Sequence, residues 1–347
     1  MAAVPHSLLV VGSIAFDTIR TPFGEAPEVL GGSATYFSVA ASFFSPVRLV
    51  GVVGEDFPQE YIKVLADRRI DTAGLQCVAG GRTFRWRGSY QGAMNEATTE
   101  DVQLNVFGDF RPTLPGRWRG TKVVFLANGS PVTQGAVLDQ VTGPALVVAD
   151  TMNLWIDTAR PALIALLARV DGLVLNDGEA RMLAAEDNLL AAAHKVLGLG
   201  PRFVVIKKGE HGAILVSREV AGKPAALPRG VSAAGVPLAA CSQCVTPGAL
   251  ADKPPVAPDA VRIAVLPAFP STAVRDPTGA GDSFAGGALG YLAGRGRYDF
   301  STLVRALAYG TVTASFTIED FGLRRLDRLT RTQIDARLGQ YRAMLKV

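Results

Sequence analysis

Short runs of apolar residues recur along the chain, and several of them are continuous rather than alternating with polar residues. Continuous apolar runs are typical of strands that are buried on both faces of a parallel sheet. The pattern therefore predicts the following strands: Leu8–Ile14, Val47–Val53, Val123–Leu126, Ala145–Ala149, Gly172–Leu175, Phe203–Ile206, Ala213–Val216 and Ile263–Leu266.

Segments in which apolar residues recur at helical spacing lie between these strands and after the last one. They predict helices over Ala34–Phe44, Gln59–Asp67, Pro161–Ala168, Gly178–Ala184, Leu189–Leu197, Phe284–Ala293 and Ala306–Ile318, and one or two surface helices over Leu326–Met344. The alternation of strands and helices predicts an α/β fold with a doubly wound, mostly parallel sheet that carries helices on both faces.

One segment with a different pattern predicts a second, small sheet. Residues Thr83–Tyr90 alternate in polarity and are rich in strand formers, with Phe84 and Trp86 on one face and arginines on the other. Thr98–Phe107 is the predicted partner strand, and part of Ile14–Leu30 completes the sheet.

A second segment, residues 218–258, is rich in Ala, Gly, Pro and Val and has little periodicity. We interpret it as a loop insertion that is partly disordered. It contains Cys241 and Cys244, and a Cys-x-x-Cys pair can be redox-active or form half of a zinc site. Cys77 and the three histidines are distant in sequence, so incidental cysteines are the favoured interpretation.

Composition narrows the choice of partner. The 347 residues are 48% hydrophobic and 19% charged with a net charge of +4, which is typical of a globular protein. Basic residues are scattered rather than clustered, so we expect no nucleic-acid partner. No apolar run reaches membrane length, and the N-terminal segment lacks the cationic region of a signal peptide. Three cysteines in a chain of this length predict a reducing, cytoplasmic location.

The motif with the clearest chemistry spans Asp276–Phe284 and opens a predicted helix. Gly279, Ala280 and Gly281 place no bulky side chain before the helix, so an anion can approach the backbone N–H groups at its positive end. Asp282 then lies in the first turn, where a carboxylate can accept a proton from a hydroxyl that attacks a phosphate. The motif predicts phosphoryl transfer, and a glycine-rich turn needed only for packing is the alternative.

The same residues, Asp-x-Thr-Gly-Ala-Gly-Asp-x-Phe, resemble the C-terminal signature of the ribokinase-like (PfkB) carbohydrate kinases. The resemblance runs from about Leu8 to Met344, with 218–258 outside it, and implies a single ribokinase-like domain over 1–347. It implies transfer of the γ-phosphoryl of ATP to a hydroxymethyl group of a sugar, with Asp282 as general base. Segments 14–33 and 82–108 would form a lid over the sugar, which in the family is often a homodimer contact.

Two glycines, Gly31 and Gly32, precede the first long predicted helix and would let a ligand touch the backbone. The resemblance implies that this pair contacts sugar hydroxyls and that Asp17 binds two hydroxyls at once. Considered alone, Asp17 would be a turn residue. The family usually carries Asn a few residues after the glycines, where this chain has Tyr36 and Phe37.

Polar residues also follow two of the buried strands, where ligands bind in open α/β sheets. Asp150 and Asn153 resemble a substrate-binding run of several sugar kinases, and capping of the next helix is the alternative. Asn176 and Glu179 match the family's Asn-x-x-Glu motif, which handles Mg²⁺ and ATP phosphate largely through water. These two residues also fit a helix capping box.

The remaining nucleotide-binding residues are implied by the resemblance. Gly209 and Gly212 fit a Gly-x-x-Gly turn that approaches the ATP phosphates, Lys207 would add positive charge, and a plain hairpin turn is the alternative. Thr278 would contact ATP. Together with Asp276 it resembles a loop that binds a monovalent cation in some members, so K⁺ is an expected activator beside Mg²⁺.

Two other functions stay open at this point. A nucleoside kinase of the adenosine kinase type would use the same motifs, with the pairs Phe84/Trp86 and Tyr36/Phe37 available to stack on a base. A non-catalytic regulator that binds a sugar or nucleotide on the same fold is the third possibility. Such a protein would not need the carboxylate of Asp282, so the sequence favours a kinase.

Overall fold

The computed structural model describes residues 6–218 and 261–345. The predicted insertion, with Cys241 and Cys244, lies almost entirely outside the described residues, so that prediction is not tested.

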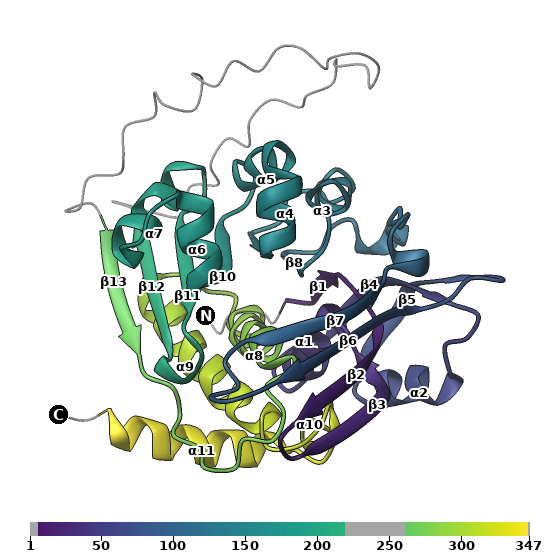
Figure 1. Cartoon of the computed structure of the whole chain (residues 1–347). Coiled ribbons are helices and arrows are strands. Elements are labelled where there is room, and N and C mark those ends of the chain that lie inside the picture. Colours follow the sequence, from purple (N-terminus) through teal and green to yellow (C-terminus); the bar gives the residue numbers. More distant parts are fainter. Residues whose placement is uncertain (1–5, 219–260, 346–347) are drawn as a thin grey trace.

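The main sheet has nine strands in the order β13-β12-β11-β10-β9-β8-β1-β4-β5 (Figure 1). All neighbouring strands are parallel except β12, which is antiparallel to both β11 and β13. The predicted doubly wound α/β fold is therefore confirmed. The strands are β1 (Leu8–Val11), β4 (Val47–Gly54), β5 (Ile70–Val78), β8 (Val123–Leu126), β9 (Leu146–Asp150), β10 (Gly172–Asn176), β11 (Phe203–Lys207), β12 (Ala213–Arg218) and β13 (Val261–Leu266).

Helices cover both faces of this sheet, as the continuous apolar strands predict. In β1, Leu8 and Val10 pack into the core beneath α1, α2, α8, α9 and α11, whereas Leu9 and Val11 pack into the core beneath α3 to α7. The helices are α1 (Ser33–Ser42), α2 (Gln59–Asp67), α3 (Pro131–Leu138), α4 (Asn153–Thr158), α5 (Arg160–Leu167), α6 (Asp177–Ala184), α7 (Leu189–Gly198), α8 (Ala280–Arg295), α9 (Phe300–Thr317), α10 (Arg324–Asp327) and α11 (Arg331–Met344). No helix among the described residues combines the length and apolarity that a membrane span needs.

Two elements at the sheet edges differ from the prediction. The strand β5 was not predicted, because polar residues interrupt its apolar pattern and most of its residues are partly or fully exposed. The strand β13 was predicted as a buried strand, but it is an edge strand in which Ile263 and Val265 are 45% and 68% exposed. Its apolar composition therefore does not report burial on both faces.

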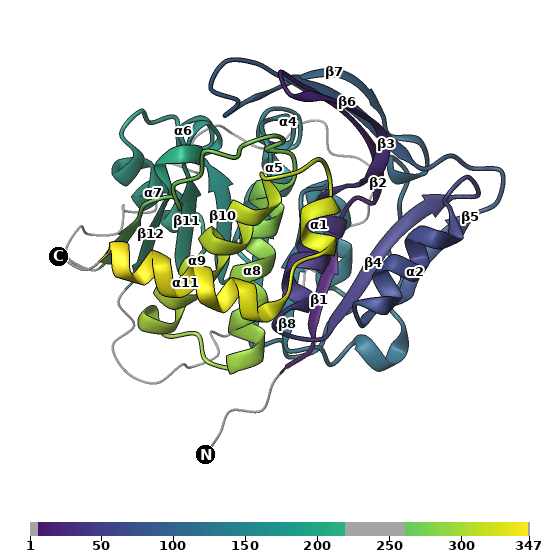
Figure 2. The same cartoon turned by 90° about the horizontal axis from the view of Figure 1, so that it is seen from below.

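The small sheet has the order β3-β2-β6-β7 and lies over one end of the main sheet (Figure 2). Its strands are β2 (Ala15–Thr21), β3 (Gly24–Gly31), β6 (Phe84–Tyr90) and β7 (Ala97–Gln103). The predicted partner strand Thr98–Phe107 is shorter than expected, because a 3₁₀ turn, η1 (Asn105–Phe107), follows it. Further such turns are η2 (Gly116–Trp118) and η3 (Gly209–His211).

The two faces of β6 have different surroundings. Trp86 is the register partner of Asp17 on the parallel strand β2, so both side chains leave the same face of the sheet. On the other face the Arg85 guanidinium pairs with Glu28 and Asp56 and lies 4.8 Å from the Phe16 ring. The arginine at position 85 thus anchors the small sheet to the main body.

The fold generates a first prediction about the segment that was interpreted as an insertion. Arg218 and Val261 are register partners on the antiparallel strands β12 and β13, so the two ends of the intervening segment are adjacent. Replacing residues 222–254 by a Gly/Ser linker of about ten residues should leave the melting temperature within about 3 °C of wild type, because a short loop can close this hairpin. Thermal unfolding and turnover of the shortened protein measure this, and loss of either would show that the segment packs or acts in catalysis.

Candidate active site

The N-terminus of α8 is built for close approach. Gly279 precedes the helix with a left-handed backbone, φ 71°, and a Cβ at this position would lie 2.3 Å from Cγ of Tyr36. A side chain is therefore excluded both by backbone conformation and by the ring beneath it. The N–H of Ala280 donates to the carbonyl of Pro277. It was expected to be available to a bound anion, so Ala280 departs from that prediction. Gly281 and Asp282 also lie in the first turn of α8, where N–H groups have no acceptor within the helix.

Asp282 lies in the first turn of α8, surrounded by other acids. Burial, and after it the charge of Asp150, raise the pKa of Asp282 to about 8, and Lys207 opposes this rise. A carboxylate with this pKa is close to balance between its charged and neutral forms at physiological pH. That is the property expected of a general base.

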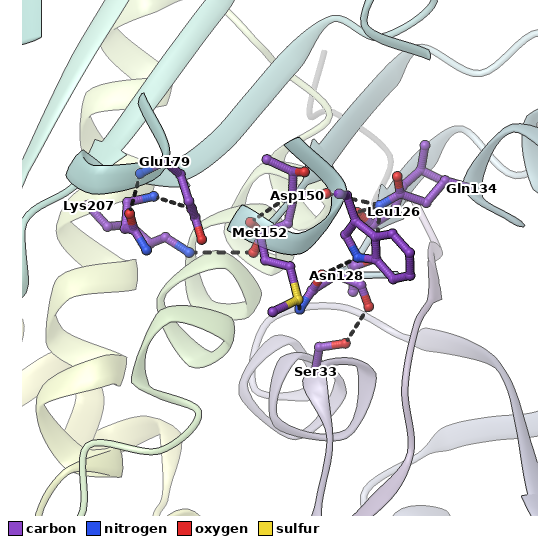
Figure 3. Close-up of polar contacts among 12 residues, drawn as sticks. Ser33, Leu126, Asn128, Gln134, Asp150, Met152, Glu179 and Lys207 are labelled. Atoms are coloured by element: carbon purple, nitrogen blue, oxygen red, sulfur yellow. Dashed lines mark hydrogen bonds and ion pairs between the residues drawn. The ribbon is translucent and has the colours of Figure 1, made fainter. Parts of the chain in front are cut away.

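Strand parity brings three predicted site residues to the α8 side of the sheet. Asp150, Asn176 and Lys207 end β9, β10 and β11, each two positions after a valine in the core that α8 covers. The Lys207 ammonium lies 3.4 Å from Oδ2 of Asp150 (Figure 3). Burial alone would lower the pKa of Lys207, but the charges of Asp150 and Glu179 outweigh it and raise that pKa.

Asn176 and Glu179 form the capping box of α6. The backbone N–H of Asn176 donates to Oε2 of Glu179 at 2.6 Å, and that of Glu179 donates to Oδ1 of Asn176 at 2.7 Å. Burial raises the pKa of Glu179 to about 7 against the charge of Lys207. The capping role that the sequence left open is therefore present, and one carboxylate oxygen of Glu179 remains for water or ion contacts.

Asp17 and the glycine pair meet beneath the small sheet. Asp17 is 4% exposed, and the N–H of Gly32 donates to its Oδ2 at 3.4 Å. A Cβ on Gly31 would lie 1.9 Å from the same oxygen, so only glycine fits there. Burial raises the pKa of Asp17 to about 7, opposed by the Gly32 hydrogen bond. The arrangement leaves a carboxylate and backbone groups together, as binding of neighbouring hydroxyls requires.

Asp276 joins two loops. Its Oδ1 accepts from the N–H of Thr278 at 2.9 Å, and its Oδ2 accepts from the N–H of Gly322 at 2.8 Å. The Thr278 hydroxyl lies 3.2 Å from the phenol of Tyr90 on the small sheet. Burial raises the pKa of Asp276. The loop before α8 is thus fixed both to the segment after α9 and to the small sheet.

The turn around Gly209 and Gly212 lies at the edge of the site. Both glycines have positive φ, and a Cβ on Gly212 would lie 2.0 Å from the carbonyl of Leu266. Asn95, at the tip of the small sheet, donates to Glu210 of this turn at 2.9 Å. The turn that was predicted to bind ATP therefore touches the sheet that was predicted to cover the acceptor.

One predicted residue stands apart. Asn153 begins α4 and is exposed, and no hydrogen bond among the described residues joins it to Asp150 or Lys207. Its amide makes no side-chain cap, so neither of the two roles considered from sequence is visible here.

Four residues that the sequence analysis did not assign line the same end of the sheet (Figure 3). The amide of Asn128 accepts from the Trp155 indole and donates to the Met152 sulfur, each at 3.1 Å. Nε2 of Gln134 lies 3.0 Å from the carbonyls of Leu126, Ala127 and Asp150. Asn128 lies two residues after the last residue of β8, so the rule that selected Asp150 and Asn176 at strand ends would also have selected it.

Known proteins are similar to this chain in fold or in sequence. The family described as pfkB family carbohydrate kinase matches residues 260–328. A cytidine kinase of Thermococcus kodakarensis is 26% identical over 292 residues, which are 83% of this chain and 89% of that protein. A ribokinase of Giardia lamblia has a TM-score of 0.72 at 15% identity and covers 97% of this chain and 99% of its own. A nucleoside kinase of Burkholderia thailandensis in complex with inosine has a TM-score of 0.68 at 17% identity, covering 96% and 98%.

The raised pKa of Asp282 predicts a cost to stability that depends on pH. Below about pH 4 the carboxyl is neutral in both the folded and the unfolded chain, so Asp282→Asn should change little. Between about pH 4 and 8 the unfolded chain releases a proton that the folded chain retains, so wild-type stability falls as pH rises. Asp282→Asn should therefore raise the melting temperature at pH 8, by about 2–5 °C.

Asp299 provides a control of opposite sign. Burial by itself would raise the pKa of this helix-capping carboxylate, but hydrogen bonds from Ser301 and Thr302 outweigh burial and lower the pKa to about 2. Its stabilising effect is present above about pH 4 and is lost as pH falls through about 2. Asp299→Ala should lower the melting temperature at pH 8.

Equal melting temperatures of Asp282→Asn and wild type at pH 5 and pH 8 would contradict the burial assigned to the Asp282 carboxylate.

Proposed function

Because the chain belongs to the pfkB family of carbohydrate kinases, we propose that it transfers the γ-phosphoryl group of ATP to a hydroxymethyl group, with Asp282 as the general base. The observation that carries the proposal is the position of the Asp282 carboxylate in the first turn of α8, beside Gly281 and a lysine ammonium. A proton acceptor thus lies next to the place where phosphate charge would collect.

The reaction follows from these groups. The acceptor hydroxyl gives its proton to the Asp282 carboxylate while its oxygen attacks the γ-phosphorus. The bond from that phosphorus to the β–γ bridging oxygen breaks, and the electron pair leaves with ADP. The N–H groups of Gly281 and Asp282 would donate to the oxygens of the transferred group, and Gly279 keeps the approach clear.

The family implies use of ATP with a divalent metal ion, and we propose that the ion is Mg²⁺. The described residues contain no cluster of three or more His, Cys, Asp or Glu that would chelate a metal. An ion near Asn176 and Glu179 would therefore keep several waters, as Mg²⁺ prefers. When bound it supplies positive charge to the ATP phosphates. Lys207, Gly209, Gly212 and Thr278 would complete the ATP site.

K⁺ activation is proposed from Asp276, which holds the loop before α8. Turnover in K⁺ compared with tetramethylammonium measures this activation directly.

We further propose that residues 1–347 form one catalytic unit in which segments 14–33 and 82–108 are the lid. The edge strand β7 is exposed along its whole length, so it is the proposed surface for a homodimer.

For the acceptor we propose a nucleoside. The relative that is similar over 83% of this chain is a cytidine kinase. On the Asp17 side of the lid, the Trp86 ring packs near Val29 and Phe321, where it would offer an apolar face to a base. A free sugar is the second candidate, because Asp17, Gly31 and Gly32 would bind its hydroxyls equally well. The sequence predicted that Asp150 and Asn153 face the acceptor. Of these two residues, we propose Asn153 as an acceptor contact.

Asp282→Asn tests the base. The amide keeps size and hydrogen bonding but accepts no proton, so kcat should fall by about 10²–10⁴ while ATP binding changes little. ADP formation with a panel of nucleosides and sugars gives kcat, and calorimetry gives ATP affinity. Retention of more than about a tenth of wild-type kcat would remove Asp282 from this role.

Trp86→Ala tests the acceptor class, with Arg87→Ala, the exposed neighbour on the same strand, as its control. Loss of a stacking surface should raise the KM for a nucleoside by roughly 5- to 100-fold and leave the KM for ATP near wild type. The KM for free ribose should change much less. If Trp86→Ala affects ribose and nucleosides equally, a free sugar becomes the favoured acceptor.

A further inference from the structure

Lys207 is placed to do more than contribute charge to a nucleotide-binding turn. Its side chain turns back from the end of β11 across β10 and reaches both Asp150 and the N-terminus of α8. A Cβ built on Gly281 would lie 3.1 Å from the Lys207 ammonium. The ammonium thus lies against the first turn of α8, which carries the N–H groups of Gly281 and Asp282.

The carboxylates around this turn would need a nearby cation for the turn to bind a phosphoryl group. Asp282 is influenced by Asp150, Asp17 and Glu179, all of which raise its pKa, and by Lys207, which lowers it. Acids alone would repel the oxygens of a phosphoryl group. Among the groups that act on Asp282, Lys207 is the cation, so it is the side chain that makes this turn attractive to an anion.

The Lys207 ammonium also has N–H donors available for a ligand. Its one hydrogen bond among the described residues goes to Oδ2 of Asp150 at 3.4 Å, which is long for an ammonium–carboxylate contact. An ammonium has three N–H donors, so two remain for oxygens of a ligand. A lysine that served only to neutralise a buried acid would be expected closer to it.

Asp150 is held firmly in turn. The residue is 3% exposed, its Oδ1 accepts from the N–H of Thr151 at 2.8 Å, and its carbonyl accepts from Gln134 (Figure 3). Gln134 also lies within 3.0 Å of the carbonyls of Leu126 and Ala127, so it joins the ends of β8 and β9. The contacts therefore run from the sheet through Asp150 to the lysine.

Building on the proposed kinase function, we infer that Lys207 donates to the oxygens of the γ-phosphoryl group during its transfer, and that Asp150 is the positioning residue that holds the ammonium at Gly281. Lys207 transfers no proton in this step. The hydroxyl proton still goes to Asp282, and the electron pair of the broken P–O bond still leaves with ADP. This assigns Asp150 a role different from the acceptor contact that the sequence suggested.

The decisive comparison uses two variants that both lack the buried carboxylate. Lys207→Met alone would leave Asp150 buried without its partner and destabilise the fold. Asp150→Asn keeps a side-chain oxygen that can accept from the Lys207 ammonium in place of Oδ2. It differs from the double variant Asp150→Asn/Lys207→Met only in the ammonium, so their kcat ratio at saturating ATP and acceptor isolates that group. We expect the double variant to be slower than Asp150→Asn by about 10²–10³, with a similar melting temperature and a similar acceptor KM. A fall smaller than about tenfold would overturn the inference.

A second readout does not depend on turnover. ADP with Mg²⁺ and aluminium fluoride imitates the phosphoryl group in transfer, and its binding is measured by the rise in melting temperature. Asp150→Asn should be stabilised more by this mixture than by ADP with Mg²⁺, and the double variant should lose that difference. If the double variant keeps it, Lys207 does not contact the transferred group.

The control is Lys195→Met, which removes an exposed lysine of α7 that pairs with Glu186, and this variant should retain wild-type kcat. Wild-type turnover is measured first with the nucleoside and sugar panel. If wild type forms no ADP with any acceptor, the proposed function fails before Lys207 is tested. If wild type is active, the ratio of the two variants judges Lys207 alone.

Discussion

The arrangement of the active site depends on one costly feature, the burial of three carboxylates around a single ammonium. Asp150, Glu179 and Asp282 all have raised pKa values, and in each case burial is the largest cause. Removing charged groups from water is unfavourable unless partners compensate. Lys207 compensates only partly, so the site remains strained electrostatically without a ligand. Such a cost is typical of sites selected for chemistry rather than for stability.

The fold accommodates this cost because its core fixes the elements that carry the charges. Three adjacent parallel strands end at the same edge and present their last residues to one face. Helix α8 packs very closely against its neighbouring helices, since a Cβ on Gly286 would lie 2.4 Å from the Phe37 carbonyl of α1 and one on Gly287 would lie 2.7 Å from Thr313 of α9. Small residues therefore let α8 pack tightly between α1 and α9, and its N-terminus has little freedom to withdraw from the lysine.

These features also explain how much of the molecule could be predicted from sequence. Continuous apolar runs identified the buried strands, because burial on both faces produces that pattern, but they missed β5 and misjudged β13 at the edges. The motifs selected Asp282 and Lys207 separately. Their proximity could not be read from sequence, because it depends on the register of β9, β10 and β11 and on the reach of a lysine across a strand. No sequence motif marks Gln134, because its side chain donates to backbone carbonyls, which every residue type carries.

Helix α1 links the two proposed substrates mechanically. Gly32, at its start, donates to Asp17 on the proposed acceptor side, and Tyr36, one turn later, places its ring beneath Gly279 on the proposed phosphate side. A movement of α1 would shift both contacts together. Transfer between two bound reactants requires the attacking oxygen and the phosphorus to be held within a few tenths of an ångström of the productive separation. A single helix that touches both sides meets that demand better than two loops would, because loops are more mobile than the elements they connect.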